Sequence, residues 1–372
     1  MRLPALVIAA LVVFAAALLA APHVSRAASL HAILAIGAMP LIFGAMSHFI
    51  PVLTRSCAAP GALTVVPLLA LAGGTLAVAG FMLAERDRAL AGGALLALFS
   101  AATLLVWSRT RRSAMLGAPH PGLAWYDAAL GCLIGALLAV LASLVCPSQS
   151  LALRRLHLHL NVLGFIALTA VGTLAVLVPT AVGRPDPQAA VRLRRDLPWA
   201  LAGTLVIATG AAGWHRLSWA GAVLWAIPLL RLSSAWLRAY RAALFAWHGA
   251  TPLLGAALGG LAASLAFGAV APSVRTLEPS AVFVVGFLLP LVCGAASQLL
   301  PVWLRPGVRG AWQGHQRARL GRWNGLRAML FAGAGIASGF GLRWPLLVAA
   351  ATLGWFLAQT AIALSTSRGS QT

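Results

Sequence analysis

"LHLHLNVLGFIALTAVGTLAVLVPTAVGR", residues 156–184, is the stretch of sequence that decides the fold. No charged residue lies between Asn161 and Arg184. About 20 uncharged, mainly apolar residues are enough for a helix to cross the hydrocarbon core of a bilayer. Yet the stretch begins with His157, His159 and Asn161, and polar side chains are costly inside a membrane. It therefore predicts a transmembrane helix whose first turns carry a functional site.

The rest of the chain has the same apolar character. Of 372 residues, 61% are hydrophobic and 9% are charged, with a mean hydropathy of +0.91, whereas a soluble domain has roughly 25% charged residues. Apolar runs long enough to span a bilayer occur at 4–22, 31–53, 62–84, 89–107, 124–146, 156–182, 197–213, 217–237, 243–270, 279–303, 325–342 and 344–365. We therefore expect an all-α polytopic membrane protein with about twelve transmembrane helices, forming a single transmembrane domain over residues 1–372.

The net charge of +21 comes from basic residues that are all arginine. When the predicted loops are assigned to alternate sides, most arginines fall on one side, including Arg305, Arg322 and Arg327 near the end of the chain. The positive-inside rule then places both termini in the cytoplasm. Contact with anionic membrane lipid explains the charge, so we expect no nucleic-acid partner. A chain without lysine is typical of a GC-rich bacterial genome, which predicts the bacterial inner membrane as the location.

Residues 1–28 resemble a signal peptide, with a basic start, an apolar run and small residues after it. The run is longer than usual for a signal, and the repeat described next requires it as a helix, so we expect it to be retained. The alternative is cleavage. The four cysteines lack CxxC spacing and predict neither a disulfide framework nor a zinc site.

An internal repeat sets the expected architecture. "GAMSHFIPVLTR" at 44–55 and "GAASQLLPVWLR" at 294–305 match at an offset of 250, and "GTLAVLVPTAVGR" at 172–184 has the same spacing from glycine to proline. These matches predict three four-helix pseudo-repeats, at about 1–115, 116–240 and 241–372.

The repeat brings two histidines into register. His31 precedes Pro51 by 20 residues and His159 precedes Pro179 by 20, while the third repeat has Ala281 at this position. Both histidines lie at the start of their helices, opposite the arginine-rich loops. We therefore expect a layer of histidines near the periplasmic face.

Helix geometry separates the functions of the histidine doublet. At about 100° per residue, His157 and His159 project roughly 200° apart and serve different sites. His31 is the natural partner of one of them, and two imidazoles from facing helices form an axial pair for haem iron. We favour His159 with His31, leave His157 for a second haem or copper, and expect Asn161 to orient a ring or bind a propionate. The alternative is that all of them are hydrated and unligated in the headgroup layer.

A second metal site is a weaker hypothesis. His48 lies about 25 Å along its helix from His31, and His248 is expected at a similar depth in the cytoplasmic half. These two side chains are candidate ligands for a second metal or haem, with local hydrogen bonding as the alternative. Gln298 stands at the position equivalent to His48, so such a site would not be threefold.

The chain resembles the catalytic subunit of haem-copper oxidases. The shared features are three four-helix units, cytoplasmic termini, a histidine that opens the second helix before "MPLIFGAMSHFIPVL" (39–53), and an H-x-H pair on an inner helix. It also resembles the NnrS family of bacterial membrane haem and copper proteins, which has an H-x-H before a glycine-rich helix containing "LTAV". The resemblance implies a haem of b type, with copper as a further candidate, and His31, His157 and His159 as ligands.

The chain also departs from the oxidase pattern. The H-x-H lies on the sixth helix rather than the tenth, the paired copper ligands and the cross-linked His-Tyr are missing, and the acidic residues lie in loops or at helix ends. We therefore expect no oxygen reduction with proton pumping. The expected functions are electron transfer, a response to nitric oxide or metal handling, with an electron-transfer or small-gas partner. The sequence leaves open whether the protein is an enzyme. The competing interpretation is a transporter for a metal ion or small solute, because proline breaks recur on the three equivalent helices.

Overall fold

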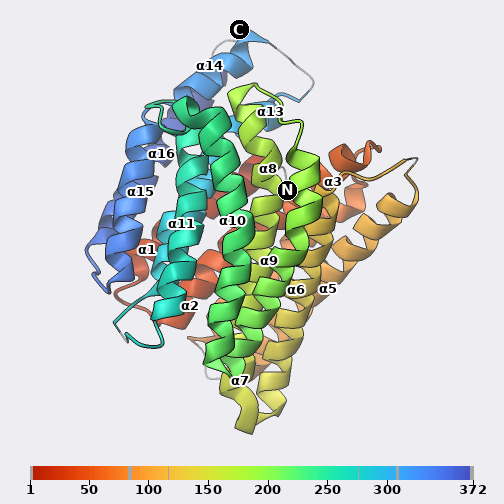
Figure 1. Cartoon of the computed structure of the whole chain (residues 1–372), viewed down its shortest axis with the longest axis vertical. Coiled ribbons are helices and arrows are strands. Elements are labelled where there is room, and N and C mark those ends of the chain that lie inside the picture. The colour runs from red at the N-terminus through yellow and green to blue at the C-terminus, as the bar shows by residue number, and fades with distance from the viewer. Residues whose placement is uncertain (1–2, 83–85, 116, 275, 307–309, 369–372) are drawn as a thin grey trace. The chain divides into compact units, whose positions relative to one another are not determined.

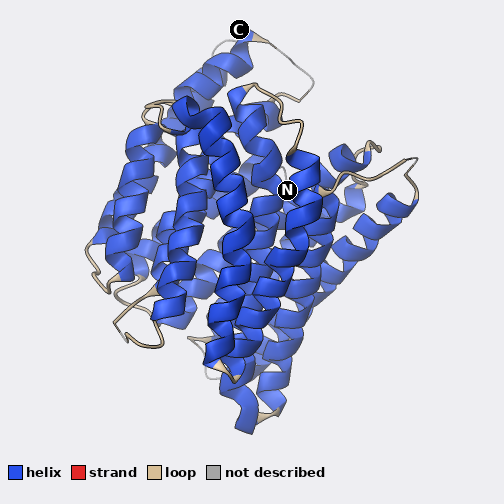
Figure 2. Cartoon of the chain, in the orientation of Figure 1, coloured by secondary structure: helices blue, strands red, loops and turns tan. Residues whose placement is uncertain are grey.

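The computed structural model describes residues 3–82, 86–115, 117–274, 276–306 and 310–368. Every regular element in this part of the chain is a helix, and none is a strand (Figure 2). The expected all-α fold is therefore confirmed for the described residues.

The helices of the first half follow the predicted apolar runs (Figure 1). They are α1 (Leu3–Ala20), α2 (Arg26–His31), η1 (Ala32–Ala38), α3 (Met39–Thr54), η2 (Gly61–Thr64), α4 (Val65–Gly80), α5 (Arg86–Ser113), α6 (Gly122–Val145), η3 (Pro147–Gln149), α7 (Ser150–His159), η4 (Leu160–Ala167) and α8 (Leu168–Val182). The short elements join their neighbours into longer continuous helices, such as 26–54 and 147–182.

The second half continues in the same way. Its helices are α9 (Ala189–Ala212), α10 (His215–Leu244), α11 (Thr251–Val270), α12 (Pro279–Ala281), η5 (Val282–Leu288), α13 (Leu289–Leu304), α14 (Ala311–Leu320), α15 (Asn324–Gly339) and α16 (Pro345–Arg368). Here α12, η5 and α13 form one continuous helix.

Ten helices among the described residues are long and apolar enough to cross a membrane. They are Leu3–Ala20, Arg26–Thr54, Gly61–Gly80, Arg86–Ser113, Gly122–Val145, Pro147–Val182, Arg216–Leu244, Thr251–Val270, Pro279–Leu304 and Pro345–Ser365. Helices satisfy their own backbone hydrogen bonds, which a bilayer interior requires. The chain is therefore a multi-pass helical membrane protein.

Two of the twelve predicted runs differ from these ten. The run 197–213 lies in α9, which begins in a charged segment containing Arg192, Arg194 and Arg195. The run 325–342 corresponds to α15, whose 16 residues extend about 24 Å, less than the roughly 30 Å hydrocarbon core. Charge in one case and length in the other separate these helices from the rest.

The predicted run 243–270 also differs from the observed helices. α10 ends at Leu244 and α11 begins at Thr251, so six residues connect them. Gly249 within this connection has φ +92°, a conformation that favours glycine. Hydropathy does not detect this break because the connection itself is apolar.

The chain packs as two compact units. Unit 1 contains residues 1–6, 20–175 and 187–228, and unit 2 contains residues 7–19, 176–186 and 229–372. In unit 1 the fully buried rings of Phe43 and Phe165 meet edge to face, with centroids 5.6 Å apart. In unit 2 the fully buried aromatic residues include Phe287, Phe331 and Phe356.

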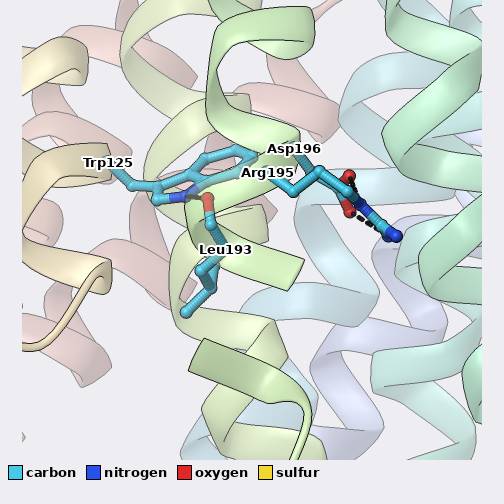
Figure 3. Close-up of polar contacts among 4 residues, drawn as sticks. All are labelled: Trp125, Leu193, Arg195 and Asp196. Carbon is cyan, nitrogen blue, oxygen red and sulfur yellow. Dashed lines mark hydrogen bonds and ion pairs between the residues drawn. The ribbon is translucent and has the colours of Figure 1, made fainter. Parts of the chain in front are cut away.

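Within unit 1, α6 is joined to α9 by a side chain that reaches across the helices. The buried Trp125 donates from Nε1 to the Leu193 carbonyl oxygen over 3.0 Å (Figure 3). Two residues after Leu193, Arg195 pairs with the buried carboxylate of its neighbour Asp196 at 2.9 Å (Figure 3). α6 also packs against α5 (Figure 1), so the Trp125 hydrogen bond ties α9 to this helix pair, and both α6 and α9 pack against the histidine-bearing α7.

Three π-helical segments interrupt the long helices. They are η1, η4 and η5, and they begin directly after His31, His159 and Ala281. These are the three positions that the sequence repeat aligns. π-helical turns inside α-helices are rare and often occur at functional sites. Sequence analysis did not predict them.

Candidate functional site

Two histidine rings face one another in unit 1. His31 ends α2 and His157 lies in α7, and their ring centroids are 6.2 Å apart with planes only 8° from parallel. The sequence prediction paired His31 with His159 through the repeat register. The structure pairs it with His157 instead, because register compares positions along a helix and does not determine which side of α7 faces α2.

The Nδ1 atoms of His31, His157 and His159 each contact a backbone carbonyl oxygen. Nδ1 of His31 contacts the Ala27 carbonyl oxygen at 2.8 Å, and Nδ1 of His159 contacts the Arg155 carbonyl oxygen at 2.8 Å. Each of these bonds lies within one helical turn. Nδ1 of His157 contacts the Ala136 carbonyl oxygen of α6 at 2.9 Å, which fixes the ring from a neighbouring helix.

These hydrogen bonds determine which nitrogen is available to a ligand. A carbonyl oxygen only accepts hydrogen bonds, so Nδ1 must be the protonated donor in each ring. In the neutral imidazole, Nε2 then keeps its lone pair. Histidines that bind metals usually donate their other ring N–H to a carbonyl or carboxylate group in this manner.

The histidine pair opens onto a cavity of about 290 Å³. Its walls come from the second, third, fourth, fifth and sixth of the continuous helices and are mostly small and apolar. Among the lining residues are His31, His157, Asn161, Phe81, Arg86, Arg154, Met39, Gly73, Gly74, Ala77, Gly93, Ala94 and Ala97. Small side chains along α4 and α5 leave room for a flat group beside the imidazoles.

The charge around the cavity is positive. Arg86 and Arg154 line it, and the lining contains no acidic residue. Phe81 connects one arginine to the histidine pair, since its ring lies 4.9 Å from that of His31 and 5.4 Å from the Arg86 guanidinium carbon. A cavity with this charge favours a ligand that carries anionic groups.

The other predicted residues lie elsewhere, except for Asn161, which lines the cavity as expected. His159 is half-buried and does not line it. His48 belongs to unit 1, where its ring contacts Phe49 with centroids 5.3 Å apart. His248 belongs to unit 2 and accepts a hydrogen bond at Nδ1 from the Trp323 backbone N–H over 3.1 Å. This contact is the local hydrogen bonding that the sequence left as the alternative for His248.

The residues present offer two imidazoles to a haem. His31 and His157 lie together at the cavity, with ring centroids 6.2 Å apart, and each keeps an Nε2 lone pair that would hold iron. Two arginines beside an apolar cavity suit a group with an apolar body and two carboxylates. For copper, no three His, Cys, Asp or Glu side chains converge as a metal site among the residues that the structure describes.

Sequence reasoning missed several cavity residues. Arg154 had a detectable signal, because it precedes His157 by three residues and therefore shares its helix face. Phe81, Arg86 and the small residues of α4 and α5 had none. Their role follows from the packing of α4 against α5, where Gly73 and Gly93 approach so closely that a Cβ on either would meet the other's carbonyl oxygen.

Fold and site together define a class: a multi-pass helical membrane protein with a histidine pair at a cationic cavity. A comparison with protein-family models gives no match, and no curated protein matches the chain.

Proposed function

We propose that the protein is a haem-binding protein of the bacterial inner membrane in which His31 and His157 are the axial ligands of one b-type haem. The observation that carries the proposal is the nearly parallel pair of imidazoles, 6.2 Å apart, at one cavity. In both rings Nδ1 is hydrogen-bonded to a carbonyl oxygen, which leaves the Nε2 lone pair available for iron. This assignment keeps the resemblance to haem-copper oxidases and NnrS proteins as a proposal and changes the favoured ligand from His159 to His157.

Ligation by two histidines favours one of the functions that the resemblance implies. A haem held by both His31 and His157 would supply one-electron transfer. We therefore propose electron transfer with a redox partner, and treat nitric oxide response and metal handling as less favoured.

The protein's own groups have separate tasks at this site. The Ala136 carbonyl oxygen fixes the orientation of the His157 ring from α6. Arg86 and Arg154 supply positive charge for the propionate carboxylates. Asn161 lines the same cavity and offers an amide to the ligand. The small residues of α4 and α5 provide space for the macrocycle.

The proposed architecture has twelve spans in three four-helix repeats, with both termini in the cytoplasm. The π-helical segments support the repeat, because each begins 19 residues before one of the aligned prolines Pro51, Pro179 and Pro301. The arginine asymmetry of the loops supports the orientation. A reporter fused within residues 369–372 or near Arg154 tests it, since we expect a cytoplasmic signal from the first and a periplasmic signal from the second.

The haem proposal is tested by optical spectroscopy of the protein purified from haem-replete cells. We expect a Soret band that His31→Ala and His157→Ala each reduce. His159→Ala is the matched control, because His159 is also half-buried and also bonded through Nδ1 to a carbonyl oxygen. A wild-type protein without colour or bound metal would instead favour a transporter for a metal ion or small solute.

A further inference from the structure

A second cavity, in unit 2, is lined mainly by cationic and polar side chains. It measures about 550 Å³ and lies where α14 turns towards α15. Its lining residues are His315, Gln316, Ala318, Arg319 and Arg322. We call it the α14 cavity. Because all five residues belong to unit 2, an inference drawn from this cavity does not depend on the haem proposal.

The cationic side chains reach the cavity from α14 and from the turn after it. His315 and Arg319 are four residues apart on α14, so they share one face of the helix. Arg322 comes from the turn that follows the end of α14 at Leu320. All three residues are exposed, so a ligand in solution or at a membrane surface can reach them.

The positive charge of the cavity has no acidic counterpart nearby in the chain. The lining contains no acidic residue. The whole sequence has six acidic residues, and none follows Glu278, so α14, α15 and α16 offer no side-chain carboxylate to the two arginines. A guanidinium has five N–H donors, and each arginine can therefore bind an anion while it keeps contacts within the protein. The charge of the cavity favours an anionic ligand.

Gln316 forms the inner wall of the cavity. It is only 6% exposed, although it lines the cavity. None of the residues that the structure describes forms a hydrogen bond with its side-chain amide. Because most buried polar groups are satisfied, this amide needs a partner inside the cavity. Its NH₂ group can donate to an oxygen of an anion held by the arginines.

The backbone that carries the two arginines is fixed by neighbouring helices. Nη1 of the buried Arg327, in α15, donates to the Arg322 carbonyl oxygen over 3.0 Å. Nε2 of Gln359, in α16, donates to the Arg319 carbonyl oxygen. The turn also holds Trp323 at φ +64°, a costly conformation for a residue other than glycine and one that occurs often at binding sites. The backbone of the cavity is therefore held in place before a ligand binds.

We propose that the α14 cavity binds one phosphate group. Arg319 and Arg322 each carry a planar fork of N–H donors that matches the oxygens of a phosphate, and His315 and Gln316 supply further donors. A phosphate monoester carries a charge close to −2 at neutral pH, which suits two arginines better than a single carboxylate does. Two sources offer this chemistry on the proposed cytoplasmic side, namely the headgroup of phosphatidic acid and free phosphate in solution.

Ala318 provides the most direct variants, because it lines the cavity and is exposed on α14. Ala318→Glu introduces a carboxylate among the arginines, whereas Ala318→Gln introduces a side chain of the same shape without the charge. Calorimetric titration of the full chain in detergent with inorganic phosphate measures one source, and native mass spectrometry with added phosphatidic acid or phosphatidylcholine measures the other. We expect the wild type to bind inorganic phosphate or to retain phosphatidic acid over phosphatidylcholine. Ala318→Glu should abolish this binding, and Ala318→Gln should keep most of it.

Two charge-matched double variants test the arginines themselves. Arg319→Gln with Arg322→Gln should weaken binding roughly tenfold or more, because each lost contact is a charge-assisted hydrogen bond. Arg238→Gln with Arg241→Gln removes the same charge from exposed sites on α10 that do not line the cavity, and should bind as the wild type does. Binding of inorganic phosphate would identify free phosphate as the source, and retention of phosphatidic acid alone would identify the lipid headgroup. A wild type that binds neither, or equal losses within either pair of variants, would overturn the proposal.

Discussion

Arg327 offers the sharpest test of how unit 2 is held together, because its side chain is fully buried in α15. Its Nη1 donates to the Asn324 side-chain oxygen at 2.8 Å and to the Arg322 carbonyl oxygen at 3.0 Å, and its Nη2 donates to the Gln359 side-chain oxygen. The guanidinium carbon lies 4.1 Å from the centre of the Trp355 ring. One cation therefore joins α15 to α16 through acceptors and an aromatic face.

The cost of Arg327→Ala follows from these contacts. Three acceptors lose their donor at about 1 kcal/mol each, the low end of the usual range, since only that of Asn324 is fully buried and those of Arg322 and Gln359 are partly buried. Loss of the cation–π contact adds about 1 kcal/mol, so we expect the free energy of unfolding to fall by about 4 kcal/mol. For a chain of 372 residues, an unfolding entropy of about 2.1 cal/mol/K per residue converts this loss to about 5 °C in Tm.

Thermal unfolding in detergent, followed by far-ultraviolet circular dichroism, measures this change. Arg327→Lys keeps the charge but loses the planar fork, so it should recover less than half of the lost stability. Arg238→Ala, at an exposed site on α10, is the control and should unfold within about 1 °C of the wild type. A Tm for Arg327→Ala equal to that of Arg238→Ala would refute the reasoning.

Three other predictions concern unit 1. Burial, and then the positive charge of Arg194, lower the pKa of His120. Its stabilising contribution is therefore fully present above the unfolded pKa of about 6.5 and is lost as pH falls towards the folded pKa. His120 Nδ1 also accepts a hydrogen bond from the Gly122 N–H. His120→Asn should therefore flatten the fall of Tm between pH 7 and 5, and an unchanged slope would contradict this role of His120. Gly74→Ala places a Cβ against the Ala35 carbonyl group and should destabilise the protein by about 2 kcal/mol. Gly92→Ala, whose Cβ meets only Leu76 at 3.9 Å, should be neutral or slightly stabilising, and equal Tm values for the two variants would show that α4 can move. Arg86→Gln with Arg154→Gln should reduce haem retention during purification. The spectrum of the haem that remains should be unchanged, because His31 and His157 are intact. Full retention would show that neither arginine binds the haem.

Much of the fold was predictable because bilayer thickness dictates helix length. The apolar runs 31–53, 124–146 and 279–303 match observed helices to within a few residues, apart from polar extensions such as Arg26–Leu30. The break between α10 and α11 was missed, since a glycine at positive φ inside an apolar segment leaves no mark on hydropathy. Arg327 was counted with the loop arginines, but it lies buried in α15 because Asn324 and Gln359 provide acceptors.

The candidate site was predicted in part. The histidines His31 and His157 and the neighbouring Asn161 were all singled out from the sequence, and the structure places them at one cavity. Whether His157 or His159 faces His31 was not predictable. The angle of about 100° per residue gives the direction of each side chain around its own helix, but not the side on which the neighbouring helix lies. The π-helical segments after His31 and His159 also change the rotation per residue, so register counted through them does not preserve direction.

Electron paramagnetic resonance of the oxidised protein tests the central claim most directly, since the spin state reports the axial ligands of the iron. If His31 and His157 hold one haem, the wild type and His159→Ala will both give a low-spin signal. His157→Ala will then lose its haem or give a high-spin signal. A low-spin signal that survives in His157→Ala and disappears in His159→Ala would contradict the pairing, and a wild-type protein without any haem signal would contradict the proposed function itself.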